Sequence, residues 1–265
     1  WTALGALAAG LMIPTTGVSS CFLAATAVFV IAAVLGLAVR TSPVHSDAQT
    51  SHRRPSFGQA LAAAARLVFD TPEVRTLTVA AVVCEIFGFS YQSAVPVLAR
   101  DVLGAGAEGL GTLNAASSLG GAAAVVVLSV LPARVPRERV LGLVFLMYGA
   151  SMIALAPNTN LAAAAAALFA IGACAASFDV LQQTLIQLAV PEDQRGRAVG
   201  VWVLGIGSAP LGNLEMGSLV ATIGAPRALA LNGVLVLAGA GLLIAAAPAY
   251  RLRSRARART LAEID

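Results

Sequence analysis

The sequence contains little charge and no lysine at all. Charged residues make up 11% of the 265 residues, whereas hydrophobic residues make up 58%. Soluble domains carry roughly a quarter charged residues and about half apolar ones. This imbalance excludes an ordinary soluble domain and predicts a polytopic membrane protein.

Cysteine and histidine are also scarce. Cys21, Cys84 and Cys174 each lie in a different apolar segment without paired spacing, so the sequence supports neither a disulfide framework nor a metal site. The two histidines, His45 and His52, belong to a polar segment and are expected to be solvated. The apolar segments contain no Ser/His/Asp set, no His/Glu metal spacing and no nucleotide loop. We therefore predict a protein that is not an enzyme and needs no cofactor.

Long apolar segments take up most of the chain. A transmembrane helix needs about 20 mostly apolar residues, and this criterion predicts an all-α membrane protein with seven full spans after a shorter apolar segment over residues 1–13. The chain opens on Trp1 within that apolar segment, so we expect it to be the C-terminal part of a longer protein. The full spans are expected at about 20–39, 74–99, 110–131, 140–156, 161–188, 198–222 and 228–247.

The distribution of arginine predicts the orientation. Lys and Arg accumulate in cytoplasmic loops, and all of the 17 arginines except Arg100 and Arg227 lie in alternate loops or in the tail. We therefore expect a multi-pass protein of the cell membrane (inner or plasma membrane) with its linker and C-terminus in the cytoplasm. The linker region ends in a mildly amphipathic stretch, residues 56–69, which is expected to form a helix on the membrane surface. The basic tail predicts anchoring to anionic lipid and not binding to nucleic acid.

A weak internal repeat supports a transporter. Shifting the chain by 207 residues superposes Leu4 and Gly5 on Leu211 and Gly212, and each pair is followed by another apolar span. Halves repeated in the same direction are one known way to build a secondary transporter.

Two stretches of the chain have the pattern of a known family: VPVLARDVLGAGAEGLGTLNAASSLGGAAA at 95–124 and LQQTLIQLAVPEDQRGRAVGVW at 181–202. They resemble the major facilitator superfamily, particularly its bacterial exporter branch that includes enterobactin and drug exporters. The resemblance implies about seven and a half helices of a twelve-helix carrier. Residues 1–39 would end the N-terminal bundle as helices 5 and 6, 40–73 would be a cytoplasmic linker with an amphipathic helix, 74–248 the C-terminal six-helix bundle, and 249–265 a basic cytoplasmic tail.

Three acids, Glu85, Asp179 and Glu215, are the only ionisable residues in the centres of their spans. A charge at the bilayer centre costs about 2.5 to 3.5 kcal/mol on insertion scales, so such residues usually face a cavity. We predict that the three acids bind substrate or couple its movement to protons. The alternatives are packing for Glu85, contact with cytoplasmic water for Asp179, and packing or snorkelling for Glu215.

Further site residues are predicted from the resemblance and from their positions relative to these acids. The resemblance implies that Glu85 lies on helix 7 and Asp179 on helix 10, which line the central cavity in the superfamily. Arg195 and Arg197 are predicted either to form a cytoplasmic gate, bonding to acids such as Glu192, or simply to anchor the loop. Phe89 and Gln92 follow Glu85 at i+4 and i+7 and so share its helix face, and Gln182 and Gln183 share a face with Asp179. These four residues are predicted to line the cavity.

The predicted function is secondary active transport, specifically proton-coupled efflux of a small amphiphilic molecule of drug or siderophore type. The expected partners are this substrate, protons, the lipid bilayer and the N-terminal bundle of the same protein, without nucleic acid. An uptake permease of the same fold is the nearest alternative. The other is a membrane scaffold or sensor that does not transport.

Overall fold

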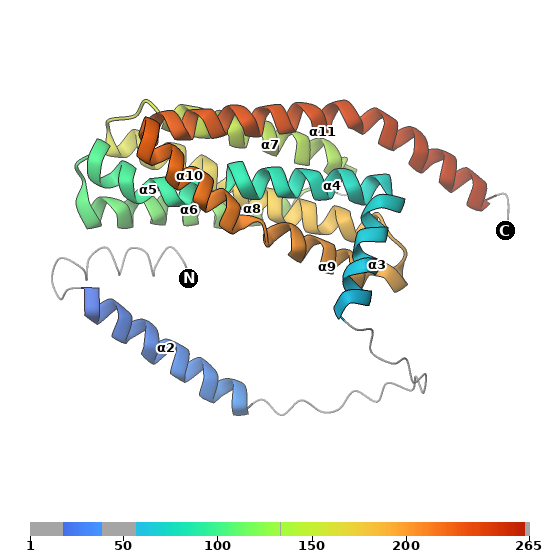
Figure 1. Ribbon diagram of the computed structural model, residues 1–265, viewed down its shortest axis with the longest axis horizontal. Coiled ribbons are helices and arrows are strands. Elements are labelled where there is room, and N and C mark those ends of the chain that lie inside the picture. Colours follow the sequence, from blue (N-terminus) through green and yellow to red (C-terminus); the bar gives the residue numbers. More distant parts are fainter. Residues whose placement is uncertain (1–17, 39–56, 133, 263–265) are drawn as a thin grey trace.

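The computed structural model describes residues 18–38, 57–132 and 134–262, and every regular element among them is helical. The predicted apolar segment 1–13 and the first half of the predicted linker, residues 40–56, lie outside the described residues. Figure 1 shows the elements along the chain. They are α2 Val18–Ala38, α3 Phe57–Asp70, α4 Pro72–Val83, η1 Cys84–Gly88, α5 Tyr91–Val97, η2 Leu98–Val102, α6 Gly106–Ser129, α7 Arg137–Leu155, α8 Leu161–Leu188, η3 Glu192–Gln194, α9 Arg195–Ile206, α10 Ala209–Ile223 and α11 Ala225–Ala262.

Five stretches within the described residues are long and apolar enough to cross a membrane. The first is a run of consecutive helical segments, α4 to η2, and α11 supplies the last through its apolar first part. This confirms the prediction of an all-α, multi-pass membrane protein. The five stretches are Pro72–Val102, Gly106–Ser129, Arg137–Leu155, Leu161–Leu188 and Ala225–Ala245.

The predicted span over residues 198–222 is divided between two helices, because α9 ends at Ile206 and α10 begins at Ala209. Pro210 lies in the first turn of α10, a position that tolerates its missing N–H. Within a continuous helix its ring would clash with the carbonyl four residues earlier, that of Ile206. A helix break just before this proline avoids the clash.

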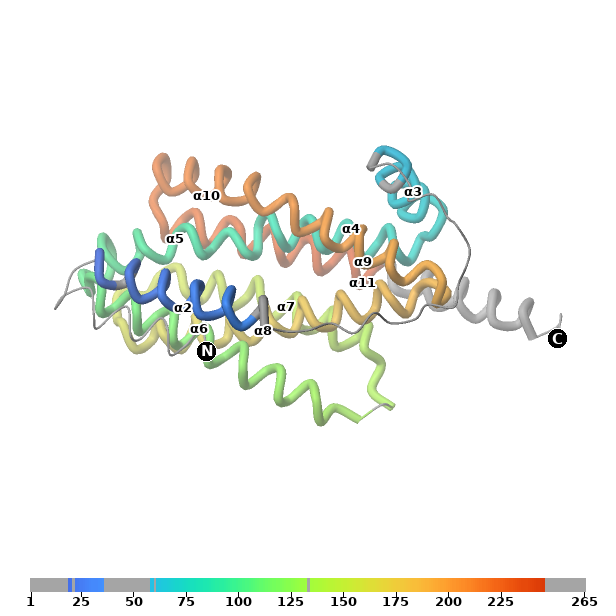
Figure 2. Tube along the Cα trace, turned by 90° about the horizontal axis from the view of Figure 1, so that it is seen from below, coloured from blue at the N-terminus to red at the C-terminus, as the bar shows by residue number. Residues whose placement is uncertain are grey.

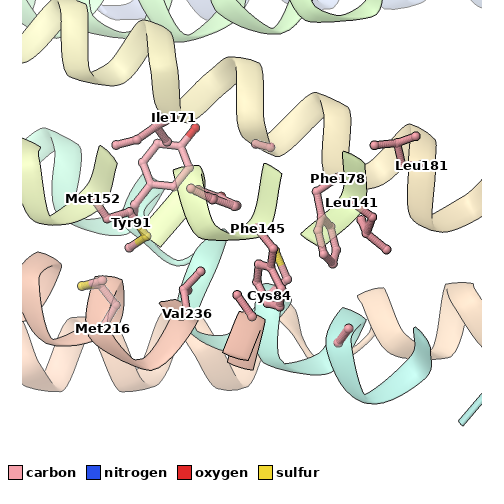
Figure 3. Packing of buried hydrophobic residues seen from close by; sticks show 14 of the residues in the cluster. Cys84, Tyr91, Leu141, Phe145, Met152, Ile171, Phe178, Leu181, Met216 and Val236 are labelled. Carbon is pink, nitrogen blue, oxygen red and sulfur yellow. The ribbon is translucent and has the colours of Figure 1, made fainter. Parts of the chain in front are cut away.

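The helices α6, α7, α8 and α11 pack side by side around an apolar core (Figures 1 and 2). Figure 3 shows part of this core, where the rings of Phe145 on α7 and Phe178 on α8 lie 5.1 Å apart between centroids. Glycine allows the closest approach between α6 and α8. A Cβ on Gly120 would meet the backbone carbonyl of Phe169, and one on Gly172 would meet that of Ser117.

The span from Pro72 to Val102 contains two π-helical turns, η1 and η2. The backbone N–H of Phe89 donates to the carbonyl of Cys84 at 2.8 Å, five residues earlier, and Leu103 donates to Leu98 in the same way at 3.0 Å. A π turn adds one residue to a helical turn, and such turns are frequent at functional sites. All side chains after η1 are therefore rotated relative to an uninterrupted α-helix.

The amphipathic stretch predicted in the linker forms α3, which crosses one end of the bundle (Figure 1). Ala64 and Leu67 are buried against the bundle, whereas Leu61 and Phe69 are 45% and 71% exposed. This exposed apolar flank fits a helix at a membrane surface. Figure 1 also shows α2 apart from the bundle, and Phe29 on α2 is 75% exposed.

Candidate functional site

Glu85 lies inside the π turn η1 and is only 9% exposed. No described residue donates a hydrogen bond to its carboxylate, and neither salt bridge among the described residues includes it. The backbone of the same turn packs closely against α10 at Gly212. A Cβ added to Gly212 would lie 2.5 Å from the carbonyl oxygen of Ile86. The acid is thus held at a helix contact while its charged group stays unpaired.

The close contact between α10 and η1 predicts that replacing Gly212 lowers the stability of the protein. Replacing Gly212 with alanine would force a methyl group against the backbone of Ile86 and Glu85. We expect the intact protein to lose about 1 to 3 kcal/mol of stability, the usual cost of overpacking, and to show a lower melting temperature in detergent. Gly217→Ala on the same helix is the matched control, because no atom lies within 4 Å of its added Cβ. Equal melting temperatures for the two variants would contradict the close contact.

Asp179 on α8 lies near Glu85, since the two carboxylates are within electrostatic range of each other. Asp179 is half-buried, and no described group hydrogen-bonds to its side chain. Two acids predicted on separate spans therefore lie within electrostatic range of each other inside one bundle. Neither has a basic partner among the described residues.

Tyr148 on α7 forms an aromatic wall beside this acid pair. It is completely buried, and its ring meets Phe89 and Tyr91 edge to face, with centroids 6.0 and 6.5 Å away. The hydroxyl of Tyr91 shares a 3.0 Å hydrogen bond with Ser117, whereas that of Tyr148 has no partner among the described residues. Buried hydroxyls are normally hydrogen-bonded. The sequence reasoning missed Tyr148, although a tyrosine in mid-span was a usable signal.

Glu215 belongs to a second polar cluster instead of the Glu85–Asp179 pair. Its carboxylate accepts a 3.0 Å hydrogen bond from the side-chain amide of Asn232 on α11, which also donates to the hydroxyl of Ser90 at 3.1 Å. Nearby, Ser93 donates to Asn213 at 2.9 Å. Asn232 was also missed, although it is the one polar side chain within the predicted span 228–247.

The four predicted cavity residues lie in different surroundings. Phe89 packs against Tyr148, but Gln92 is exposed and no longer shares a face with Glu85, because the π turn changes the register between them. Gln182 is 1% exposed and donates to the backbone carbonyl of Leu77 at 3.3 Å. Gln183 is half-buried. In this conformation Gln182 therefore joins α8 to α4.

The two predicted gate arginines have different roles in the structure. Arg195 forms an exposed salt bridge of 3.2 Å with Glu192, as the sequence suggested for a nearby acid. Arg197 instead lines a groove of about 740 Å³ between α3, the start of α4 and α9. The groove also contains Arg66, Asp70 and Glu73. Only one of the two arginines pairs with the adjacent acids.

A comparison with known protein families agrees with the helical, membrane-spanning architecture described above. The family described as transmembrane secretion effector, of the major facilitator superfamily, matches residues 2–261. The chain belongs to this family. No curated protein and no solved structure was found to match it. The protein is therefore a transporter of the major facilitator superfamily type. In this transporter, Glu85 and Asp179 are carboxylates within the bundle, and Glu215 lies at a separate junction of helices.

Proposed function

We propose that the intact transporter exports a small amphiphilic molecule and takes up protons in exchange, with Glu85 and Asp179 as the coupling acids. The observation that carries the proposal is that these two buried or half-buried carboxylates lie within electrostatic range of each other inside the bundle, without any described hydrogen-bond donor or basic partner. An unpaired carboxylate within a membrane span is costly. Binding of either a proton or a cationic substrate would remove that cost.

The exchange follows from competition for the same charge. A carboxylate that has accepted a proton is neutral and no longer attracts a cation, whereas an ionised carboxylate does. Protons entering from one side and substrate entering from the other would therefore replace each other.

The surroundings of the pair support an amphiphilic substrate. Phe89 and Tyr91, on the span that carries Glu85, pack their rings against Tyr148 on α7 and contribute an aromatic cluster to the same bundle. Aromatic faces bind both apolar groups and organic cations. A molecule with an apolar ring system and a positive or polar group, such as a drug or siderophore, fits this combination.

The topology forms part of the same proposal. We place α3, the linker and the C-terminus on the cytoplasmic side of the cell membrane, following the positive-inside rule. Residues 1–39 would complete the N-terminal bundle, 40–73 the linker, 74–248 the C-terminal bundle and 249–265 the tail. In this arrangement Arg195 and Arg197 lie at the cytoplasmic gate.

Transport by inverted membrane vesicles tests the direction and the coupling. Vesicles containing the intact protein should accumulate amphiphilic dyes such as ethidium when their lumen is made acidic, and a protonophore should abolish accumulation. Accumulation only in right-side-out vesicles would indicate an uptake permease. Accumulation unaffected by the protonophore and by an imposed pH gradient would contradict proton exchange.

A further inference from the structure

A groove of about 260 Å³ lies between α4 and α11, and we call it the α4–α11 groove. Figure 2 shows the two helices next to each other, and residues of both line the groove. Val79 on α4 and Leu242 on α11 line it and are 57% and 73% exposed. Within the part of the chain that the structure describes, the groove is therefore open to the outside of the bundle.

The groove is apolar along most of its length and closes at one end. Two small residues, Ala80 on α4 and Gly239 on α11, leave space between the helices. A Cβ added to Gly239 would lie 2.7 Å from the Cγ1 atom of Val83, so the two helices touch at that point. The groove therefore ends at Val83, and its opposite end along α4 is Arg75.

The length of the groove matches one leaflet of a bilayer. Arg75 lies in the first turn of α4, directly after α3, whose exposed apolar flank fits a helix at a membrane surface. From Arg75 to Val83, α4 rises about 12 Å at 1.5 Å per residue. One leaflet contributes about 15 Å, half of the hydrocarbon core of a bilayer. The groove therefore runs from the level of the lipid headgroups into the region of the acyl chains.

Arg75 is the only charged residue among the described residues that line the groove. Its side chain is exposed, and neither salt bridge in the described part of the chain includes it. The hydroxyl of the neighbouring Thr76 already donates to the carbonyl of Pro72 at 2.9 Å. A guanidinium can donate two parallel hydrogen bonds to a phosphate. Arg75 therefore places an anion-binding group at the headgroup end of an apolar groove.

The other helix of the groove leads to further positive charge. α11 continues past Leu243 to Ala262, and the sequence of this extension contains five arginines from Arg251 to Arg259. Arg251 follows Leu243 by eight residues, which is about 12 Å along a helix. Basic segments that directly follow a span attract anionic lipid. Positive charge on both helices therefore favours a lipid with a net negative charge over a zwitterionic one.

We propose that the α4–α11 groove binds an anionic phospholipid. The headgroup phosphate bonds to Arg75, and one acyl chain lies against Val79, Ala80 and Leu242. The lipid contacts the part of α4 that leads into η1, where Glu85 follows Val83 by two residues. The site depends neither on the molecule that is exported nor on the exchange proposed for Glu85 and Asp179.

Thermal melting of the purified intact protein in detergent tests this site, because a ligand that binds the folded state raises the melting temperature. Melting is measured with increasing phosphatidylglycerol, with phosphatidylcholine that carries the same acyl chains, and with glycerol 3-phosphate. Phosphatidylglycerol should raise the melting temperature at lower concentrations than phosphatidylcholine, and glycerol 3-phosphate should have no effect. Equal responses to the two lipids, or to phosphatidylglycerol and glycerol 3-phosphate, would overturn the proposal.

Two substitutions separate the headgroup contact from the acyl-chain contact. Arg75→Gln should raise the phosphatidylglycerol concentration for a half-maximal response about tenfold, as expected for the loss of one charge-assisted hydrogen bond. Val79→Trp fills the groove and should abolish the response. The matched controls are Arg139→Gln at the exposed start of α7 and Val126→Trp on the exposed face of α6, and both should respond like the wild type. An unchanged response in Arg75→Gln, or an equal loss in Arg139→Gln, would mean that the lipid binds elsewhere.

Photo-cross-linking locates the lipid without any substitution. Phosphatidylglycerol with a photoreactive diazirine in one acyl chain is reconstituted with the intact wild-type protein, and the labelled residues are identified by mass spectrometry. Labels should concentrate on residues 75–83 and 239–243. Labels spread evenly over the exposed faces of the spans would contradict a specific site. Absence of labels from both ranges would show that another part of the intact protein covers the groove, and the proposal would fail.

Discussion

Gly172→Ala should prevent the stable assembly of α6 against α8. A methyl group on Gly172 would overlap the backbone carbonyl of Ser117, which belongs to a helix and cannot rotate away as a flexible side chain would. The two helices would have to separate along a contact that the reciprocal glycine, Gly120, also requires. We expect a loss of about 3 kcal/mol or more, at the upper end of overpacking costs. Chromatography and thermal melting of the intact protein in detergent measure this loss.

Gly241→Ala on α11 is the matched control for Gly172→Ala. No atom lies within 4 Å of the added Cβ of residue 241, and alanine favours a helix over glycine by up to about 1 kcal/mol. The control should therefore be at least as stable as the wild type. A stable, monodisperse Gly172→Ala protein would mean that α6 and α8 do not approach as closely as described.

Glu85→Gln/Asp179→Asn should abolish transport driven by a pH gradient. The substituted amides keep the size and polarity of the acids but cannot exchange a proton near neutral pH. Neither carboxylate has a hydrogen-bond donor or ion-pair partner among the described residues, so the substitutions break no described bond and should leave folding intact. Ethidium accumulation in inverted vesicles should fall to the level of vesicles that lack the protein.

Two exposed acids provide matched controls for this double variant. Glu108→Gln and Asp193→Asn make the same chemical changes outside the bundle interior, and together they should leave accumulation unchanged. The single variants Glu85→Gln and Asp179→Asn should show effects that are not additive, because residues in one electrostatic network rarely act independently. Additive effects would mean that the two acids act separately.

Hydropathy predicted much of the fold because a bilayer imposes strong rules on a chain. Spans must be long, apolar and helical, and helices α6, α7, α8 and α11 follow that pattern. The break before Pro210 was missed because the apolar run continues through it. The glycines and the proline around Ser208 are residues that favour a helix break, and they were visible in the sequence.

The acids of the candidate site were also predictable, whereas their neighbours were less so. A lone carboxylate in an apolar span is conspicuous, and the sequence singled out Glu85, Asp179 and Glu215. The partners required three-dimensional contacts, since Asn232 reaches Glu215 from another helix. The position of Gln92 depended on a π turn, which adds one residue without any pattern in the side chains.

Proton movement on substrate binding tests the central claim, that Glu85 and Asp179 exchange protons for cargo. Ethidium, or another dye found to accumulate in vesicles, is added to the purified intact protein in weakly buffered solution at neutral pH. The account predicts that the wild type releases protons as the dye binds and that Glu85→Gln/Asp179→Asn releases none. Equal proton release by the two proteins, or dye binding to the wild type without any release, would contradict it.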